Sequence, residues 1–215
     1  MAASGPRSKA PARQTAILEI TFRHLVARGF EGLRIRDIAE AVGINQATLL
    51  YHFQDKEELI VALVDNLIAK LRSFNEGHYA IEPGSFAAFD AHLRTLRELF
   101  VSTPEIYVAL NEIAVRAIRH PKIAAKIAAV EDNWTRYIGT LLHAAVPNAE
   151  AADVAATALA AVVFVRGISA KATGDGTLAL LIARGKGRKA ASRRIEIAIN
   201  TFAALVRGGF APGMT

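Results

Sequence analysis

Hydrophobic positions in the first part of the chain repeat at the spacing of short amphipathic helices. A first helix is predicted from Gln14 to Gly29, where glycine ends a helix in the usual manner. Its apolar stripe, at i, i+4, i+7 and i+8, consists of Leu18, Phe22, Leu25 and Val26. Two more helices are predicted to share a core with it, through Ile35, Ile38, Ala39, Val42, Leu49 and Phe53. The pattern therefore predicts a compact three-helix unit over about 14–53.

The connection between the second and third of these helices is typical of a helix-turn-helix. Gly43 is placed to make the turn, Ile44 to fill the corner and Asn45 to cap the third helix. The outer face of the third helix then consists of Gln46, Ala47, Leu50 and Tyr51, with Thr48 at its edge. Such a helix can enter the major groove of DNA. Basic residues flank this face, where they could meet phosphates: Arg34, Arg36 and Lys56.

Beyond this unit, the pattern predicts further helices and no strand. Asp55 is placed to cap a helix that runs to about Asn75. The remaining helices are predicted at 85–102, 104–119, 121–145, 150–172 and 189–207. The apolar segment TLALLIA lies among glycines and is interpreted as part of a loop. The fold class is therefore all-α, with a flexible basic arm at 1–13, a first domain at 14–58 and a second at 59–215.

Composition narrows the class of protein. Hydrophobic residues make up 52% of the chain and charged residues 21%, which is typical of a globular protein. The absence of cysteine excludes disulfides and thiolate metal sites and fits the reducing cytoplasm. We find no secretory signal, and the most apolar run, 153–166, is shorter than the ~20 residues of a membrane span. We therefore expect a cytoplasmic protein that makes no contact with a membrane.

The net charge of +6 comes from two separate basic regions. Residues 1–28 carry five basic residues against one acid, and they adjoin the suspected DNA-binding unit. Segment 184–194 carries six basic residues and no acid, whereas residues 57–183 are mildly acidic. This second basic segment is interpreted as a solvated loop and helix start, with contact to an acidic ligand or a partner as the alternative.

No pattern of catalytic or metal-binding residues stands out. No two histidines have the i, i+4 spacing of a helical metal site. The chain has six of them: His24, His52, His78, His92, His120 and His143. There is no Ser-His-Asp spacing, paired-carboxylate site or glycine-rich phosphate loop. We therefore expect no enzyme activity, no cofactor and no metal.

The segment GFEGLRIRDIAEAVGINQATLLYHFQDKEEL, residues 29–59, resembles the DNA-binding domain of TetR-type transcriptional regulators. The likeness covers roughly residues 14–60. Its most specific elements are Gly29-Phe30, Asp37-Ile38-Ala39, Gly43-Ile44, Thr48-Leu49, Tyr51-His52-Phe53, and Lys56-Glu57 with Leu59. The resemblance implies an all-helical homodimer whose two recognition helices enter successive major grooves of double-stranded DNA.

The resemblance also implies which residues touch DNA. Contacts to bases fall on Arg36, Gln46, Ala47 and Leu50. Contacts to phosphates fall on Thr48, Tyr51, His52 and Lys56. The amide of Gln46 suits adenine, and Leu50 suits a thymine methyl group. The chain departs from the family at Leu33-Arg34, where a pair of threonines is common, and at Leu50, where an aromatic residue is common. The first change removes a helix cap and adds a charge, and both changes alter the expected operator.

The C-terminal part resembles the family only loosely, in the segment STPEIYVALNEIAVRAIRHPKIAAKI, residues 102–127. In the family this region forms a helical ligand pocket and a dimer interface. Candidate pocket residues are Phe89, Leu93, Leu96, Phe100, Tyr107, Leu110, Trp134, Tyr137 and Phe164. Ordinary helix packing is the alternative for each of them.

Helix 150–172 is apolar nearly all round, which predicts full burial. One copy of the chain has little to cover it, so a dimer interface with 189–207 is predicted. We therefore expect a homodimeric transcriptional repressor that a small molecule releases from a palindromic operator. Two alternatives remain: a DNA-binding regulator without a ligand, and a helical small-molecule-binding protein or enzyme whose N-terminal unit does not bind DNA.

Overall fold

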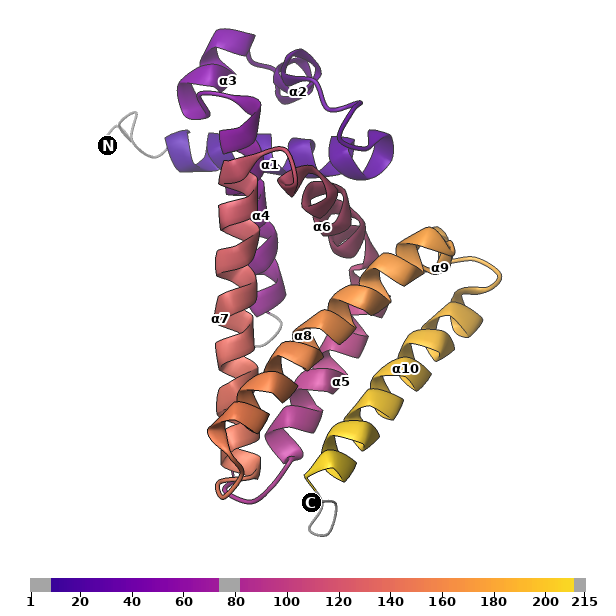
Figure 1. Cartoon of the computed structure of the whole chain (residues 1–215). Coiled ribbons are helices and arrows are strands. Elements are labelled where there is room, and N and C mark those ends of the chain that lie inside the picture. The colour runs from indigo at the N-terminus through magenta and orange to yellow at the C-terminus, as the bar shows by residue number, and fades with distance from the viewer. Residues whose placement is uncertain (1–8, 74–81, 211–215) are drawn as a thin grey trace, which may run out of the picture. The chain divides into compact units, whose positions relative to one another are not determined.

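The computed structural model describes residues 9–73 and 82–210, which form ten helices and no strand (Figure 1). The first six helices are α1 (Lys9–Arg28), α2 (Ile35–Val42), α3 (Gln46–His52), α4 (Lys56–Ser73), α5 (Ala87–Ser102) and α6 (Pro104–Ala117). The last four are α7 (Pro121–Ala145), α8 (Ala151–Gly174), α9 (Thr177–Ala183) and α10 (Arg188–Gly209). The predicted all-α fold class is confirmed.

The chain divides into two compact units, and the division differs from the predicted boundary after residue 58. The first unit contains residues up to Ala69 together with Ala109–Ile127. The second contains Lys70–Val108 and the chain from Ala128 onward. The segment 109–127 joins the first unit because its polar side chains bind residues 30, 31 and 57, which no periodicity could indicate.

The first helix starts earlier and buries a different stripe than predicted. α1 begins at Lys9, so residues 9–13 are helical and not part of an arm, while residues 1–8 lie outside the described residues. Its most buried residues are Ile17, Thr21 and Leu25. The hydroxyl of Thr21 donates to the Ile17 carbonyl at 2.7 Å, so this polar side chain is satisfied inside the core. Leu18, Phe22 and Val26, from the predicted stripe, are half-buried.

The second unit packs its core between α5, α7, α8, α9 and α10. Its buried side chains include Phe89, Leu142, Val162, Leu178 and Ile199, one from each of these helices. In Figure 1, α8 and α10 run alongside each other and α9 joins them. Ion pairs at the rim hold the same helices together: Arg97 and Glu196 at 3.4 Å, Arg207 with Asp90, and Arg166 with Glu131.

The segment TLALLIA, predicted as loop, forms the seven-residue helix α9. Leu178 and Leu181 are fully buried, so apolar burial outweighs the glycines around the segment, which lie outside it. Asp175 caps its start, since its carboxylate accepts a hydrogen bond from the Thr177 N–H at 3.0 Å. Hydrogen bonds from the side chain and backbone of Thr177 lower the pKa of Asp175 to about 2.

One residue of the basic segment 184–194 has a structural role. The Arg188 guanidinium donates to the carbonyls of Leu181 and Val101, at 3.1 and 3.0 Å. These carbonyls lie in the last turns of α9 and α5, where helical partners are missing. The other five basic residues of the segment are exposed, and they are Arg184, Lys186, Lys189, Arg193 and Arg194.

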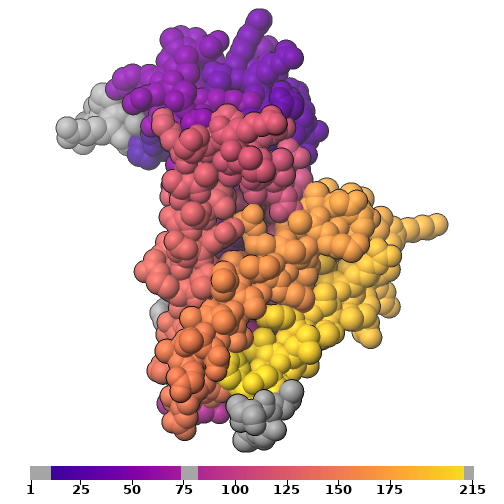
Figure 2. All heavy atoms as spheres, in the orientation of Figure 1, coloured from indigo at the N-terminus to yellow at the C-terminus, as the bar shows by residue number. Residues whose placement is uncertain are grey.

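A single chain covers only part of α8, in agreement with the expectation that one copy has little to cover a helix whose pattern predicts full burial. α8 is 24 residues long, and by length and composition it is apolar enough to cross a membrane, unlike the shorter run expected from the sequence. Only 33% of its most apolar window is buried. Leu159 and Val163 are 55% and 61% exposed, and Ile197 and Leu205 of α10 are exposed as well. Figure 2 shows the surfaces of α8, in orange, and α10, in yellow, side by side on one face.

We expect Arg188→Met to lower the free energy of unfolding by about 2 kcal/mol, because two carbonyls lose a charged donor. Urea denaturation followed by circular dichroism measures this change. Lys189→Met is the matched control, since Lys189 is exposed and adjacent, and it should alter stability by less than about 0.5 kcal/mol. Equal effects of the two substitutions would contradict the structural role of Arg188.

Candidate functional site

Local backbone chemistry fixes the position of α3 against α2. Gly43 adopts φ +76° and ends α2, and the N–H groups of Gly43 and Ile44 donate to the carbonyls of Glu40 and Ala39, each at 3.0 Å. The side chain of Asn45 accepts a hydrogen bond from the Thr48 N–H at 2.7 Å and caps α3. The predicted turn and cap are confirmed, and they form the helix-turn-helix geometry.

The outer face of α3 carries the residues that sequence analysis placed there. Leu49 and Phe53 are buried beneath it. The exposed or half-buried side chains are Gln46, Ala47, Thr48, Leu50, Tyr51 and His52. Tyr51 is 86% exposed, and its ring meets the edge of the His52 ring at 5.7 Å. A tyrosine so little covered by its own chain adds nothing to the core, and its ring is accessible to another molecule.

Two arginines lie at the start of α2, beside this face: Arg34 precedes the helix and Arg36 is in its first turn. Arg34 has extended backbone, φ −113° and ψ 131°, and no side-chain cap, which confirms the loss of the cap predicted from Leu33-Arg34. Within the described residues, Arg34 and Arg36 are exposed and form no hydrogen bond or ion pair. Arg28, by contrast, is paired with Asp37 at 3.2 Å. Both free guanidinium groups are available to phosphates.

Lys56 does not point freely outward, as a simple phosphate contact would. Its Nζ donates to the Phe30 carbonyl at 3.0 Å and lies 4.1 Å from the centroid of the Phe30 ring. Burial lowers the pKa of Lys56. The ammonium group therefore holds the loop between α1 and α2, a role that sequence analysis missed because the two residues are 26 positions apart.

Helix α6 holds the same loop from another side. The Phe30 N–H donates to the Glu112 carboxylate at 3.2 Å. Arg116 pairs with Glu31 at 2.7 Å, and its guanidinium carbon lies 5.1 Å from the Phe30 ring centroid. We call these contacts of Glu112, Arg116 and Lys56 the Phe30 clamp. The sequence offered only one indication of it, the opposite charges of Glu112 and Arg116 at i, i+4.

The candidate ligand residues of the second unit fall into separate groups. Five of them are buried in one core, and these are Phe89, Leu93, Leu96, Phe100 and Tyr107. Leu110 belongs to the other unit, Tyr137 is 39% exposed, and Phe164 stacks on Phe202 of α10 with centroids 4.2 Å apart. Trp134 packs against the core and donates from its indole N–H to Nε2 of His92 at 3.0 Å.

Two polar groups in this core matter for ligand binding. Burial lowers the pKa of His92 to about 4, so its ring is neutral and accepts from Trp134. Tyr107 stacks on Phe100 with centroids 3.9 Å apart. Its buried hydroxyl has no hydrogen-bond partner among the described residues, and burial raises its pKa. A buried hydroxyl without a partner costs stability unless a bound molecule satisfies it.

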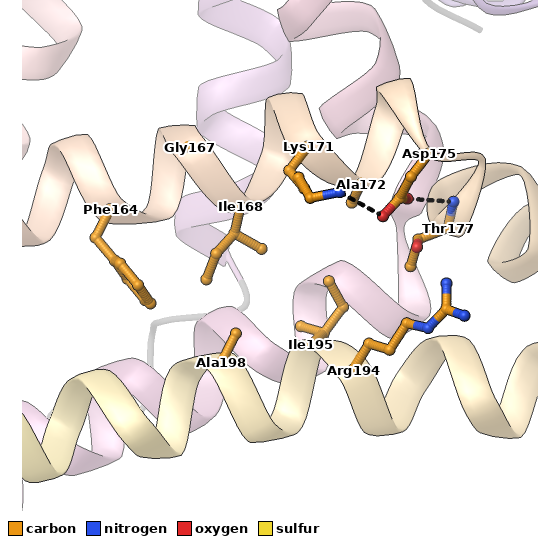
Figure 3. Close-up of a pocket in the computed structure, with 10 residues that line it drawn as sticks. All are labelled: Phe164, Gly167, Ile168, Lys171, Ala172, Asp175, Thr177, Arg194, Ile195 and Ala198. Atoms are coloured by element: carbon orange, nitrogen blue, oxygen red, sulfur yellow. Dashed lines mark hydrogen bonds and ion pairs between the residues drawn. The ribbon is translucent and has the colours of Figure 1, made fainter.

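A groove of about 460 Å³ lies between α8, α9 and α10 (Figure 3). Its floor is apolar and its mouth carries Lys171, Asp175 and Arg194. The lining residues are Phe164, Gly167, Ile168, Lys171, Ala172, Asp175, Thr177, Arg194, Ile195 and Ala198. Of the predicted pocket residues, only Phe164 lines it.

The first unit of the chain is similar to known bacterial regulators. Residues 17–63 match the model of "Bacterial regulatory proteins, tetR family". The HTH-type transcriptional regulator RutR of Escherichia coli (strain K12) is 37% identical over 78 residues, covering 34% of this chain and 37% of RutR. The match therefore spans little more than a third of that relative's length.

Solved structures share the fold over most of the chain. A transcriptional regulator from Rhodococcus sp. Rha1 matches with a TM-score of 0.69 and 18% identity, covering 88% of this chain and 95% of that one. A protein from Saccharomonospora viridis, solved in complex with choline, matches with a TM-score of 0.65 and 19% identity, covering 88% and 96%.

We expect Lys56→Met to lower the free energy of unfolding by roughly 2 kcal/mol, because the Phe30 carbonyl loses a charged donor and the ring loses its cation. Tyr51→Ala is the contrasting variant, and it should leave stability within about 0.5 kcal/mol, since Tyr51 is exposed. Thermal and urea denaturation measure both. An unchanged free energy of unfolding in Lys56→Met would contradict the structural role of Lys56 and leave it only the role of a phosphate contact.

Proposed function

We propose that the chain is a member of the TetR family of bacterial regulatory proteins and acts as a homodimeric DNA-binding transcriptional repressor. A small molecule releases it from a palindromic operator. The observation that carries the proposal is the outer face of α3, which a capped turn presents to solvent above buried Leu49 and Phe53. Its relatives regulate transcription, and we assign the chain no catalytic role.

The side chains on this face divide into two roles. Base contacts are assigned to Arg36, Gln46, Ala47 and Leu50. Phosphate contacts are assigned to Arg34, Thr48, Tyr51 and His52. Lys56 supports the interface through the Phe30 clamp, and its remaining N–H groups can still reach a phosphate. Phosphate contacts set orientation and affinity, whereas base contacts set sequence preference.

The proposed dimer covers the exposed apolar face of α8 and α10. Leu159, Val163, Ile197 and Leu205 are exposed in a single chain, and burying them in a second copy is favourable. A lipid bilayer is the less favourable cover, because Asp153, Arg166 and Lys171 lie within the same helix. Two linked recognition helices also bind a palindrome far more tightly than one. Such a repressor acts where DNA is, in the cytoplasm.

The proposed ligand response rests on the core around Tyr107. The unpartnered hydroxyl and the neutral His92–Trp134 pair offer polar contacts inside an apolar core, as small-molecule sites do. A neighbour of the same fold was solved with choline bound. α6 carries Tyr107 in one unit and Glu112 and Arg116 of the Phe30 clamp in the other. A ligand that prefers one position of α6 shifts the population of DNA-binding states.

The proposed function predicts salt-dependent binding to the DNA flanking the protein's own gene. The logarithm of the affinity should fall linearly with the logarithm of salt concentration, because phosphate contacts release counterions. Arg34→Gln should reduce that slope by about 1, whereas Gln46→Ala should cost roughly 1–3 kcal/mol at one base position and leave the slope unchanged. Fluorescence anisotropy measures both. A DNA affinity that does not depend on salt concentration would contradict the DNA-binding hypothesis.

Tyr107→Phe should raise the free energy of unfolding of the ligand-free protein by about 1 kcal/mol, because the unpartnered buried hydroxyl is removed and the stack on Phe100 is kept. Urea denaturation measures the change. Tyr51→Phe, at a position that is 86% exposed, is the control and should be neutral. A destabilising effect of Tyr107→Phe would mean that the hydroxyl is already satisfied within the chain.

A further inference from the structure

His120 contacts the first unit on both sides of the helix-turn-helix. Its ring centroid is 6.0 Å from that of Phe30, in the loop that precedes α2. Its Nδ1 lies 2.5 Å from the carboxylate of Glu57, in the first turn of α4, the helix that follows α3. An ionised carboxylate only accepts hydrogen bonds, so Nδ1 of His120 is the donor. The two ends of the segment that contains α2 and α3 therefore meet at one imidazole.

The backbone fixes His120 at the corner between α6 and α7. Its N–H donates to the Ala117 carbonyl at 3.3 Å, and its carbonyl accepts from the Ala124 N–H at 2.9 Å. Pro121 follows as the first residue of α7, a position that suits the fixed backbone of proline. The His120 side chain is 32% exposed, so it contacts Glu57 and can still exchange protons with solvent.

The other charged side chains around this corner are bound elsewhere or exposed. Lys56, next to Glu57 on α4, donates to the Phe30 carbonyl. Arg119, at the end of α6, is exposed. The remaining groups have their own partners, and these are Glu112 with the Phe30 N–H, Arg116 with Glu31 and Lys122 with Asp55. Histidine is the side chain that changes its charge near neutral pH, so the contact of His120 with Glu57 is the pair that pH can adjust.

We propose that His120 is a positioning residue for DNA binding, and that its protonation favours the DNA-binding arrangement of the first unit. Protonation adds the attraction of opposite charges to the hydrogen bond with Glu57. The stronger contact holds α4 and the Phe30 loop against the start of α7, and so restricts α3, which lies between them in the chain. DNA affinity should therefore be highest below about pH 6 and fall as the pH rises toward about 8. This inference rests on the proposed DNA binding and adds a regulation of it.

His52 has to be separated from His120 in any test. His52 lies on the recognition face and is assigned to a phosphate, so its own protonation would also raise DNA affinity at low pH. His52→Gln removes that direct contribution and leaves the contact of His120 with Glu57 unchanged. The measurements are therefore made on the full-length H52Q protein and on further variants of it.

Fluorescence anisotropy with the DNA flanking the protein's own gene, at constant ionic strength, measures the effect. The H52Q protein should bind about fivefold more tightly at about pH 6 than at about pH 8. Adding His120→Gln, which keeps a neutral donor, should remove most of this ratio and give the weaker affinity at both pH values. Adding His120→Lys, which stays charged, should also remove it but give the tighter affinity at both. Adding Glu57→Gln should act like His120→Gln, because the acceptor loses its charge.

Lys122→Gln is the matched control, because it removes the neighbouring ion pair with Asp55 and no group that titrates near neutral pH. It should keep the pH ratio of the H52Q protein, whatever it does to the affinity itself. Circular dichroism at both pH values shows whether each variant is folded. If H120Q is unfolded, E57Q gives the same test from the other partner.

The outcomes separate this inference from the proposed function. If H120Q, H120K and E57Q keep the full pH ratio, the titrating group lies elsewhere and the positioning role of His120 is overturned. A ratio of one in the H52Q protein, with salt-dependent binding intact, also overturns it and leaves the DNA-binding proposal standing. If salt-dependent binding is absent at both pH values, the proposed function itself fails, and the role of His120 fails with it.

Discussion

The DNA-binding unit depends on how the loop around Phe30 is fixed. Its N–H binds Glu112, its carbonyl binds Lys56, and its ring lies against Lys56 and Arg116. The next helix, α2, begins at Arg34 without a side-chain cap, so its start is not fixed locally. The Phe30 clamp supplies that missing constraint from two distant helices. α3 follows α2 through a tight turn, so the Phe30 clamp also determines the orientation of the recognition face.

The same constraint gives the proposed ligand response a physical route. Tyr107, with its unpartnered hydroxyl, and Glu112 stand five residues apart on α6. A helix of this length moves as a stiff element, so a ligand that favours one position of Tyr107 also favours one position of Glu112. Only a difference in ligand affinity between the two positions can shift the population, and the required coupling of a few kcal/mol is within the range of a charge-assisted clamp.

Local chemistry was predictable from the sequence, and distant pairing was not. The Gly43 turn, the Asn45 cap and the missing cap at Arg34 followed from residue types, because each involves neighbours within five positions. The roles of Lys56 and Arg188 escaped, since each donates to a carbonyl far away in the chain. The sequence predicts a loop at 177–183 because seven apolar residues between glycines have no helical period of their own, whereas tertiary burial makes them the helix α9.

The pattern of α8 is the most informative one in the second unit. Its pattern indicates burial on all sides, yet one copy of the chain covers only one side of it. A hydrophobic pattern reflects the environment of the working assembly, and a single chain shows only part of that environment. The exposed residues Leu159 and Val163 therefore mark where the rest of the assembly belongs.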